Sequence, residues 1–297
     1  SAEKGTAAYA DGQVLAPRAA HPVRCRGAQF RRSAGASPAP TAPQRILNQR
    51  GGTRPLARRW HSMNRALALI CFVAAVAFAI SPLLTPGFNG FSPDQFPVPQ
   101  VDPPIQPAGW AFSIWGLIYA WLILGTGFGL LKRAEAASWA PHRLPLAISL
   151  VLGTGWLPLA VISPVWATVL IWIMLATALW ALRACTTSDR WLQQAPIAIY
   201  AGWLTAASVV ALMLCLAGYD IGLGMTGWGW IGLALATGLA VTVQRLSPHA
   251  PEYGLTVIWA LTGIIAANWG DWLFVLGAAL GLGIVGWTII ATRQERA

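Results

Sequence analysis

The side chains best suited to specific chemistry in this sequence are large rings with polar tips, placed at helical spacing inside apolar segments. Phe112, Trp115 and Tyr119 follow i, i+3, i+7 spacing and therefore share one face of a helix. Tyr200 and Trp203 stand three residues apart and share a face in the same way. Such a face is either packed core or the wall of a pocket. A pocket with these walls would suit a flat apolar ligand, anchored by indole N–H and phenol O–H groups.

Groups that could catalyse a reaction are scarce. The interiors of the apolar segments contain no Asp, Glu, Lys, Arg or His, which argues against a proton relay, an ion pump or a voltage sensor. The sequence has no Walker-type loop, HExxH or GxSxG motif, and its four cysteines form no CxxC or Cys/His cluster. We therefore predict no enzyme, no metal site and no required cofactor. Asp271 is expected to be a solvated helix cap, and His249 and Glu252 to be surface residues.

The composition places these rings in a lipid-embedded protein. Of 297 residues, 56% are hydrophobic and only 10% are charged, against roughly 25% charged in an ordinary soluble domain. About 20 apolar residues are needed for a helix to span a bilayer. We therefore predict an all-α, polytopic transmembrane bundle with about eight spans. These are Ala66–Leu84, Ala111–Leu131, Leu144–Ile162, Val165–Leu182, Ala195–Leu216, Trp228–Val243, Gly254–Ala267 and Trp272–Ala291. The sixth and seventh are short, so they either extend into their flanks or form a re-entrant pair.

The positive charges test this topology independently, because Lys and Arg accumulate in cytoplasmic loops. With an inside N-terminus, all nine Lys and Arg after residue 62 fall on one side of the membrane. They are Arg65, Lys132, Arg133, Arg143, Arg183, Arg190, Arg245, Arg293 and Arg296. The opposite loops contain none. We therefore predict both termini in the cytoplasm. The expected location is the bacterial inner (plasma) membrane.

Residues 1–62 have a different character. They hold 11 Lys or Arg against 2 Asp or Glu, and thus most of the formal net charge of +10. Without sustained apolar periodicity, this basic arm is predicted to be disordered. It fits either an organellar transit peptide, which would place the protein in an organellar membrane, or translated sequence upstream of an initiation at Met63. It shows no basic face with interleaved aromatics, so no nucleic-acid partner is expected.

The longest outside loop, residues 85–110, is dense in Pro and Gly and should be irregular but stiff. Because it also contains Phe88, Phe91, Phe96 and Val101, we expect it to fold back as a cap. Amphipathic indoles favour the headgroup region. Six tryptophans at or near segment ends are interpreted in this way: Trp139, Trp191, Trp228, Trp230, Trp269 and Trp272.

Three motifs, in order, resemble the TspO/MBR family of tryptophan-rich sensory proteins and translocator proteins. The stretch PAGWAFSIWGLIYAW presents Trp110, Phe112, Trp115 and Tyr119 after a Pro-rich loop. LGTGWLPL is similar to the family's L-N-x-x-W-S helix at Leu152 and Trp156, and IYAGWLTAA to its P-Y-x-x-W-x-x-F-A helix at Tyr200, Trp203 and Ala207. The chain departs from the family where Gly153 replaces the Asn and Leu157 the Ser of the third helix. The resemblance implies a five-helix unit over residues 63–217, followed by three additional helices over 218–297.

The resemblance also implies a function. The family's pocket lies beneath the outer loop and binds tetrapyrroles such as protoporphyrin IX or a haem-like molecule, and sterols in some members. Its roles are sensory, regulatory or transport-related. Carried over by position, the ligand-binding residues are Trp110, Phe112, Trp115, Tyr119, Trp156, Tyr200 and Trp203. The expected partners are the lipid bilayer and a hydrophobic small molecule. Two glycine pairs at GxxxG spacing, Gly125/Gly129 and Gly277/Gly281, are compatible with a homodimer but common in membrane helices.

Two other functions fit the sequence. Eight spans could form a permease subunit for a small neutral or lipidic solute, although ion coupling would be hard to build without interior charges. Alternatively, the aromatics could serve only packing, in a structural or assembly subunit of the membrane.

Overall fold

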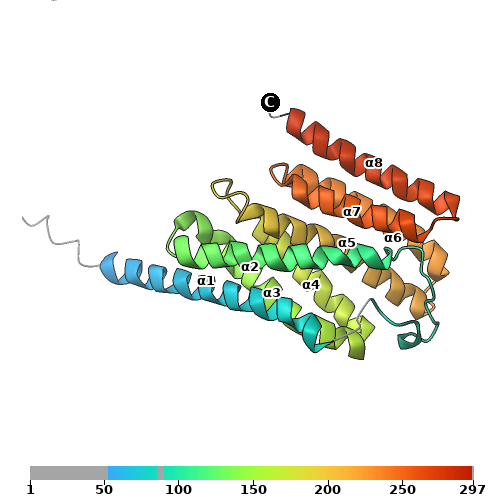
Figure 1. Cartoon of the computed structure of the whole chain (residues 1–297), viewed down its shortest axis with the longest axis horizontal. Coiled ribbons are helices and arrows are strands. Elements are labelled where there is room, and N and C mark those ends of the chain that lie inside the picture. The colour runs from blue at the N-terminus through green and yellow to red at the C-terminus, as the bar shows by residue number, and fades with distance from the viewer. Residues whose placement is uncertain (1–52, 86–89, 296–297) are drawn as a thin grey trace, which may run out of the picture. The chain divides into compact units, whose positions relative to one another are not determined.

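A computed structural model describes residues 53–85 and 90–295 of the chain. In these residues it contains eight α-helices and no strand (Figure 1), which confirms the predicted all-α membrane bundle. Three short 3-10 helices connect them: η2 (Pro93–Gln95), η3 (Gly109–Ser113) and η4 (Ala137–Trp139). The α-helices are α1 (Thr53–Leu84), α2 (Ile114–Lys132), α3 (Ala140–Ile162), α4 (Pro164–Arg183), α5 (Gln194–Gly218), α6 (Gly224–Leu246), α7 (Pro251–Ala267) and α8 (Trp272–Gln294).

Helix lengths answer the question left open for the sixth segment. Within the described residues, seven helices are long and apolar enough to cross a membrane. The sixth is one of them, because α6 extends into both flanks of its predicted segment and reaches 23 residues. Helix α7 is apolar but has only 17 residues.

The start of α1 corrects the predicted boundary of the basic arm. The arm was expected to be disordered as far as residue 62, but residues 53–62 form the first turns of α1. Pro55 lies in the first turn, where proline is well tolerated. The apolar run from residue 66 already forms a helix, and adding residues to an existing helix costs less free energy than starting a new one. The remainder of the arm, residues 1–52, lies outside the described residues.

The first five helices pack as a ring in the order α1, α2, α5, α4, α3. Helices α6 and α7 pack on α5, and α8 packs on both of them. Helix α5 is therefore enclosed from both sides, and 83% of the residues in its most apolar 18-residue stretch are buried. Helices α1 and α8 lie on opposite sides of the bundle in Figure 1.

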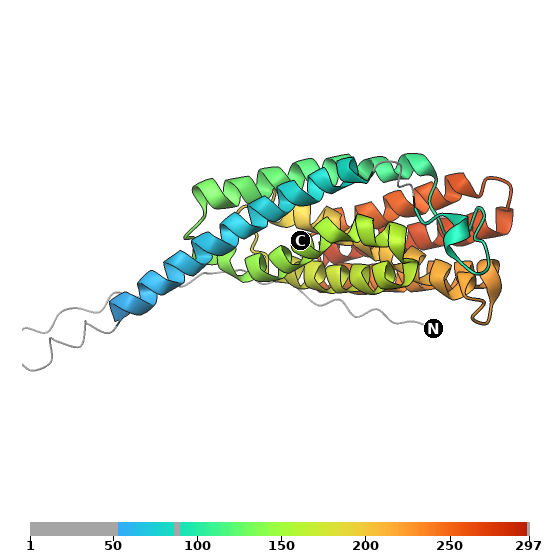
Figure 2. The ribbon, with the colours of Figure 1, turned by 90° about the horizontal axis from the view of Figure 1, so that it is seen from below.

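The two ends of the bundle differ in charge. Because successive helices run antiparallel, odd-numbered helices begin and even-numbered helices end at the same end, which we call the basic end. The other end, the loop end, carries residues 90–113, 219–223 and 268–271, which contain no Lys or Arg. Figure 2 shows the teal loop segment before α2 at this end. The charged residues at the basic end include Arg65 on α1, and Lys132, Arg183, Arg245 and Arg293 in the last turns of α2, α4, α6 and α8.

The glycine pairs permit close contacts within the chain. A Cβ on Gly125 would meet the carbonyl oxygen of Leu192, and one on Gly129 would lie 2.6 Å from the ring of Trp139. Similarly, the ring of Trp230 packs directly against Gly277. Both GxxxG faces are thus used for packing inside this bundle.

Candidate functional site

The ring of five helices encloses a cavity of about 430 Å³ near the loop end. All five helices and η3 contribute to its wall, which is mostly apolar. Five of the seven predicted ligand-binding residues line it. They are Phe112, Trp115, Tyr119, Trp156 and Trp203.

Ring contacts fix the shape of the aromatic wall. Trp115 and Tyr119 stack nearly parallel, with centroids 5.2 Å apart and an interplanar angle of 16°. Phe112 meets Trp203 edge-on at 5.6 Å, which joins η3 to α5. Offset and edge-on pairs are the favoured arrangements of aromatic rings. The rings of Phe112, Trp115 and Tyr119 therefore do both things that the sequence allowed: they pack against other rings, and they line the cavity.

The polar tips around the cavity differ in their availability. Trp156 donates its indole N–H to the carbonyl of Ala167 at 2.9 Å, so this donor is already used. Trp203 is only 2% exposed, and its Nε1 has no hydrogen-bond partner among the described residues. A buried N–H without a partner is costly, and native structures usually satisfy it. Trp203 therefore provides a donor at the cavity for which the described residues supply no acceptor.

Tyr200, one of the predicted site residues, lies behind the cavity wall. It is fully buried, and its hydroxyl lies 2.9 Å from Oγ of Ser149. The residue that takes its place at the wall is Phe78 of α1, whose ring contacts Tyr200 at 5.8 Å. Sequence reasoning missed Phe78 because the other phenylalanine of its segment, Phe72, is six residues away, a spacing that places the two on different faces of a helix.

Trp110, the other predicted site residue outside the wall, lies on the outer surface. It is 47% exposed and contacts the ring of Trp259 edge-on at 5.0 Å. Trp259 in turn donates its indole N–H to the carbonyl of Ala111 at 2.9 Å. These two tryptophans therefore join the start of η3 to α7 and do not contribute to the cavity.

The loop before η3 folds over the bundle. The backbone N–H of Val98 donates to Gly218 at the end of α5, and that of Ala108 donates to Gly263 on α7. Phe96 is buried, whereas Val101 is exposed; Phe88 falls outside the described residues. A second cavity of about 50 Å³, lined by Phe91 among others, lies beneath this loop. It shares Phe112, Trp156, Trp203 and Ala207 with the larger cavity.

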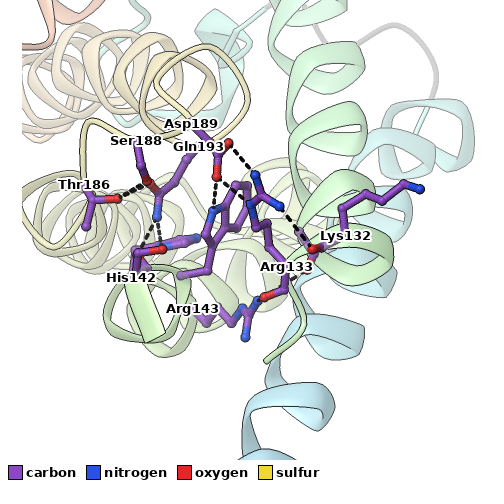
Figure 3. A network of polar contacts seen from close by, with 11 residues as sticks. Lys132, Arg133, His142, Arg143, Thr186, Ser188, Asp189 and Gln193 are labelled. Carbon is purple, nitrogen blue, oxygen red and sulfur yellow. Dashed lines mark hydrogen bonds and ion pairs between the residues drawn. The ribbon is translucent and has the colours of Figure 1, made fainter. Parts of the chain in front are cut away.

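A polar network closes the basic end (Figure 3). Asp189, in the connection between α4 and α5, accepts hydrogen bonds from Arg133 at 2.9 and 3.2 Å and from the Trp139 indole at 2.8 Å. The hydrogen bond from Arg133 holds the pKa of the Asp189 carboxyl below its usual range. Nearby, Gln193 donates to Nδ1 of His142 at 2.9 Å. The network thus ties the α2–α3 connection to the α4–α5 connection.

Arg143 corrects the expectation of a loop residue. It lies on α3, is only 2% exposed, and donates to four backbone carbonyls. Three of these belong to Gly129, Arg133 and Ala134, where α2 ends and its carbonyls lack helical partners. Arg143 therefore caps α2.

Two further expectations about the basic end were wrong. Trp139 was interpreted as a headgroup-belt residue, but it is only 2% exposed, because its ring packs against Gly129 and His142 while Asp189 accepts its N–H. Glu252 was expected on the surface; it is 8% exposed, on α7, and paired with Arg190. Sequence windows do not reveal such partners, which lie 50 and 62 residues away. Asp271 does cap α8, accepting from the N–H of Phe274 at 3.2 Å.

The fold and cavity define an integral membrane protein: a helical bundle with an aromatic cavity bordered by a folded loop. A family model described as TSPO-like protein matches residues 63–292, and the chain belongs to this family. The match runs through α6, α7 and most of α8, so it is not limited to the first five helices. No curated protein and no solved structure matches the chain.

Proposed function

We propose that this protein binds a flat hydrophobic ligand, tetrapyrrole or sterol-like, in the 430 Å³ cavity, in a sensory, regulatory or transport-related role. The observation that carries the proposal is the convergence of five predicted aromatic residues on one cavity. Ligand pockets in proteins commonly measure about 300–1,000 Å³, with mainly apolar walls and a few polar groups. The cavity has this size and character.

The chemistry of the wall favours a planar molecule with at least one acceptor atom. The stacked pair Trp115 and Tyr119 presents ring surface to a ligand. The free indole N–H of Trp203 is a donor in need of an acceptor. Neither the Tyr119 hydroxyl nor the Trp115 indole has a hydrogen-bond partner within the described ranges, so both tips are available too.

The position of the cavity suggests how a ligand enters. Pro82 and Thr85, at the end of α1, belong to its wall together with Gly109 and Ser113. These residues lie at or next to the two ends of the loop 85–110, so we propose that a ligand enters beneath this loop. The positive charges at the basic end favour a cytoplasmic location for both termini, with the bacterial inner membrane as the proposed location, or an organellar membrane if the arm is a transit peptide.

Binding accounts for the geometry better than passage of a solute. At the basic end, Trp139, His142 and Arg143 surround a cavity of only about 20 Å³ among the described residues. A permease would have to open the network of Figure 3 in each cycle. Flux of a neutral solute into proteoliposomes would favour the permease, whereas saturable binding without flux favours the proposal.

Quenching of tryptophan fluorescence by protoporphyrin IX tests the proposal. The purified protein should show saturable quenching, and both Trp115→Ala and Trp156→Ala should weaken binding. Trp166→Ala is the matched control, because Trp166 is 65% exposed on α4 and does not line the cavity. Absence of saturable quenching, or equal affinity in all three variants, would refute a tetrapyrrole site here.

A further inference from the structure

A second cleft, of about 520 Å³, lies at the basic end between the last turns of α6 and α8. Unlike the aromatic cavity, it has a largely polar wall. It is lined by Arg245 from the end of α6 and by Trp287, Thr288, Thr292 and Glu295 from the end of α8, among others. The cleft shares no residue with the proposed ligand cavity.

The cleft holds two opposite charges that do not neutralise each other. Arg245 and Glu295 form no ion pair with one another, and neither side chain has a hydrogen-bond partner in the described part of the chain. Three other arginines at this end are paired with carboxylates: Arg65 with Glu135, Arg133 with Asp189, and Arg190 with Glu252. A guanidinium binds phosphate well, and a carboxylate accepts hydrogen bonds from a cation.

The two threonines add acceptors and no donors. Thr288 donates its hydroxyl to the carbonyl of Ile284 at 2.8 Å, and Thr292 donates to that of Thr288 at 2.8 Å. Each oxygen keeps lone-pair capacity after its proton is used. A molecule in this cleft therefore meets one cationic donor on the α6 side, and a carboxylate with two hydroxyl acceptors on the α8 side.

The cleft also continues into a surface suited to an acyl chain. Trp287 is 69% exposed at its edge, and an indole at this level favours the membrane interface. Ile284 and Leu280, about one and two turns from Trp287 towards the loop end, are exposed on the same helix. An occupant with a polar head and an apolar tail thus fits both the cleft and the helix face above it.

We propose that this cleft binds a phospholipid whose headgroup carries both a phosphate and a primary ammonium, as in phosphatidylethanolamine. Arg245 binds the phosphate, while Glu295 and the two threonine oxygens accept from the ammonium. A primary ammonium has three N–H donors, whereas the quaternary ammonium of phosphatidylcholine has none. Phosphatidylglycerol offers the phosphate but no cation for Glu295.

Native mass spectrometry of the full chain tests this site. The protein is extracted from nanodiscs containing equal amounts of phosphatidylethanolamine, phosphatidylcholine and phosphatidylglycerol, and the retained lipids are counted. We expect phosphatidylethanolamine to be retained over phosphatidylcholine by about fivefold, the upper range for a water-exposed ion pair. Equal retention of both, or preferred retention of phosphatidylglycerol, would overturn the proposal.

Two variants and a control test which residue contacts the ammonium and which contacts the phosphate of the headgroup. Glu295→Gln should reduce the ratio of phosphatidylethanolamine to phosphatidylcholine to about one, because only the ammonium contact is weakened. Arg245→Gln should reduce retention of both lipids, because both contain the phosphate. Arg293→Gln, a control on the same helix end but outside the cleft, should leave the ratio unchanged. An unchanged ratio in Glu295→Gln, or an equal loss in Arg293→Gln, would show that the cleft does not select the headgroup.

Discussion

The ring of Phe78 packs directly against Gly153, where a Cβ would lie 2.9 Å from the phenylalanine ring. Gly153 stands where the resembling family has an asparagine, so the missing side chain leaves room for Phe78 against α3. Phe78 also contacts Tyr119 edge-on at 5.1 Å and covers Tyr200 from the cavity side. The contact with Gly153 thus holds the ring of Phe78 in the cavity wall.

Restoring the asparagine should therefore displace Phe78. Gly153→Asn is expected to destabilise the protein by about 1–3 kcal/mol, as for an overpacked core, and to weaken protoporphyrin IX binding. Combining Gly153→Asn with Phe78→Ala should recover part of the lost stability and part of the lost affinity, because the phenylalanine ring no longer clashes with the asparagine. Thermal unfolding and ligand titration of the two single variants and the double variant measure this coupling. Strictly additive effects would show that the two residues do not compete for space.

The close approach of α2 to the α4–α5 connection gives a second prediction. In Gly125→Ala the new methyl group would meet the backbone oxygen of Leu192, which cannot rotate away, so a loss of about 1–3 kcal/mol is expected. Gly116→Ala is the control on the same helix, because nothing lies within 4 Å of its Cβ position. It should be neutral or stabilise α2 by up to about 1 kcal/mol. Equal melting temperatures for the two variants would contradict the packing described.

The Asp189 network predicts a pH dependence of stability. Asp189→Ala leaves the buried N–H of Trp139 without an acceptor, which should cost about 1–3 kcal/mol at pH 7. Because its folded-state pKa lies below the ordinary value, Asp189 stabilises the protein above its unfolded pKa of about 3.9. This contribution is lost as the pH falls through the lower folded pKa. The difference in melting temperature between wild type and variant should therefore persist at pH 5 and shrink below pH 4. A difference that disappears already at pH 6 would exclude this carboxylate as its source.

Trp203 separates the role of an indole N–H from that of ring packing. Trp203→Phe keeps an aromatic ring but removes the donor that has no partner in the described structure. The smaller phenylalanine ring loses packing contacts, but the substitution also removes the cost of burying an N–H without a partner. The free energy of unfolding should therefore change little. If the N–H donates to the bound ligand, affinity should fall about tenfold. An unchanged dissociation constant for protoporphyrin IX would exclude this contact.

The helices were predictable because long apolar runs carry a strong signal. The eighth segment was predicted as Trp272–Ala291 and observed as Trp272–Gln294. Helix ends were less predictable, since Arg143 and Glu252 are buried by partners far away in the chain. Charged residues next to an apolar run look like loop residues until those partners are known.

The cavity was partly predictable for a related reason. The spacing of Phe112, Trp115 and Tyr119 identified a shared face, which the structure turns towards the cavity. The same pattern could not show that Tyr200 is covered by Phe78, or that Trp110 packs on Trp259. Those outcomes depend on how α1 and α7 pack, and no local periodicity records that.

A cavity-filling substitution tests the central proposal most directly. Ala207 on α5 lines both the 430 Å³ cavity and the adjoining 50 Å³ cavity. Ala207→Trp should place a large ring in this space, whereas Ala120→Trp, at an exposed position of α2 outside the cavity, serves as the control. The measurement is the dissociation constant of protoporphyrin IX, followed by its own absorption band. We predict at least a tenfold weakening in Ala207→Trp, because the new ring occupies the space that the ligand needs. Ala120→Trp should keep the wild-type affinity. Wild-type affinity in Ala207→Trp would contradict binding in this cavity.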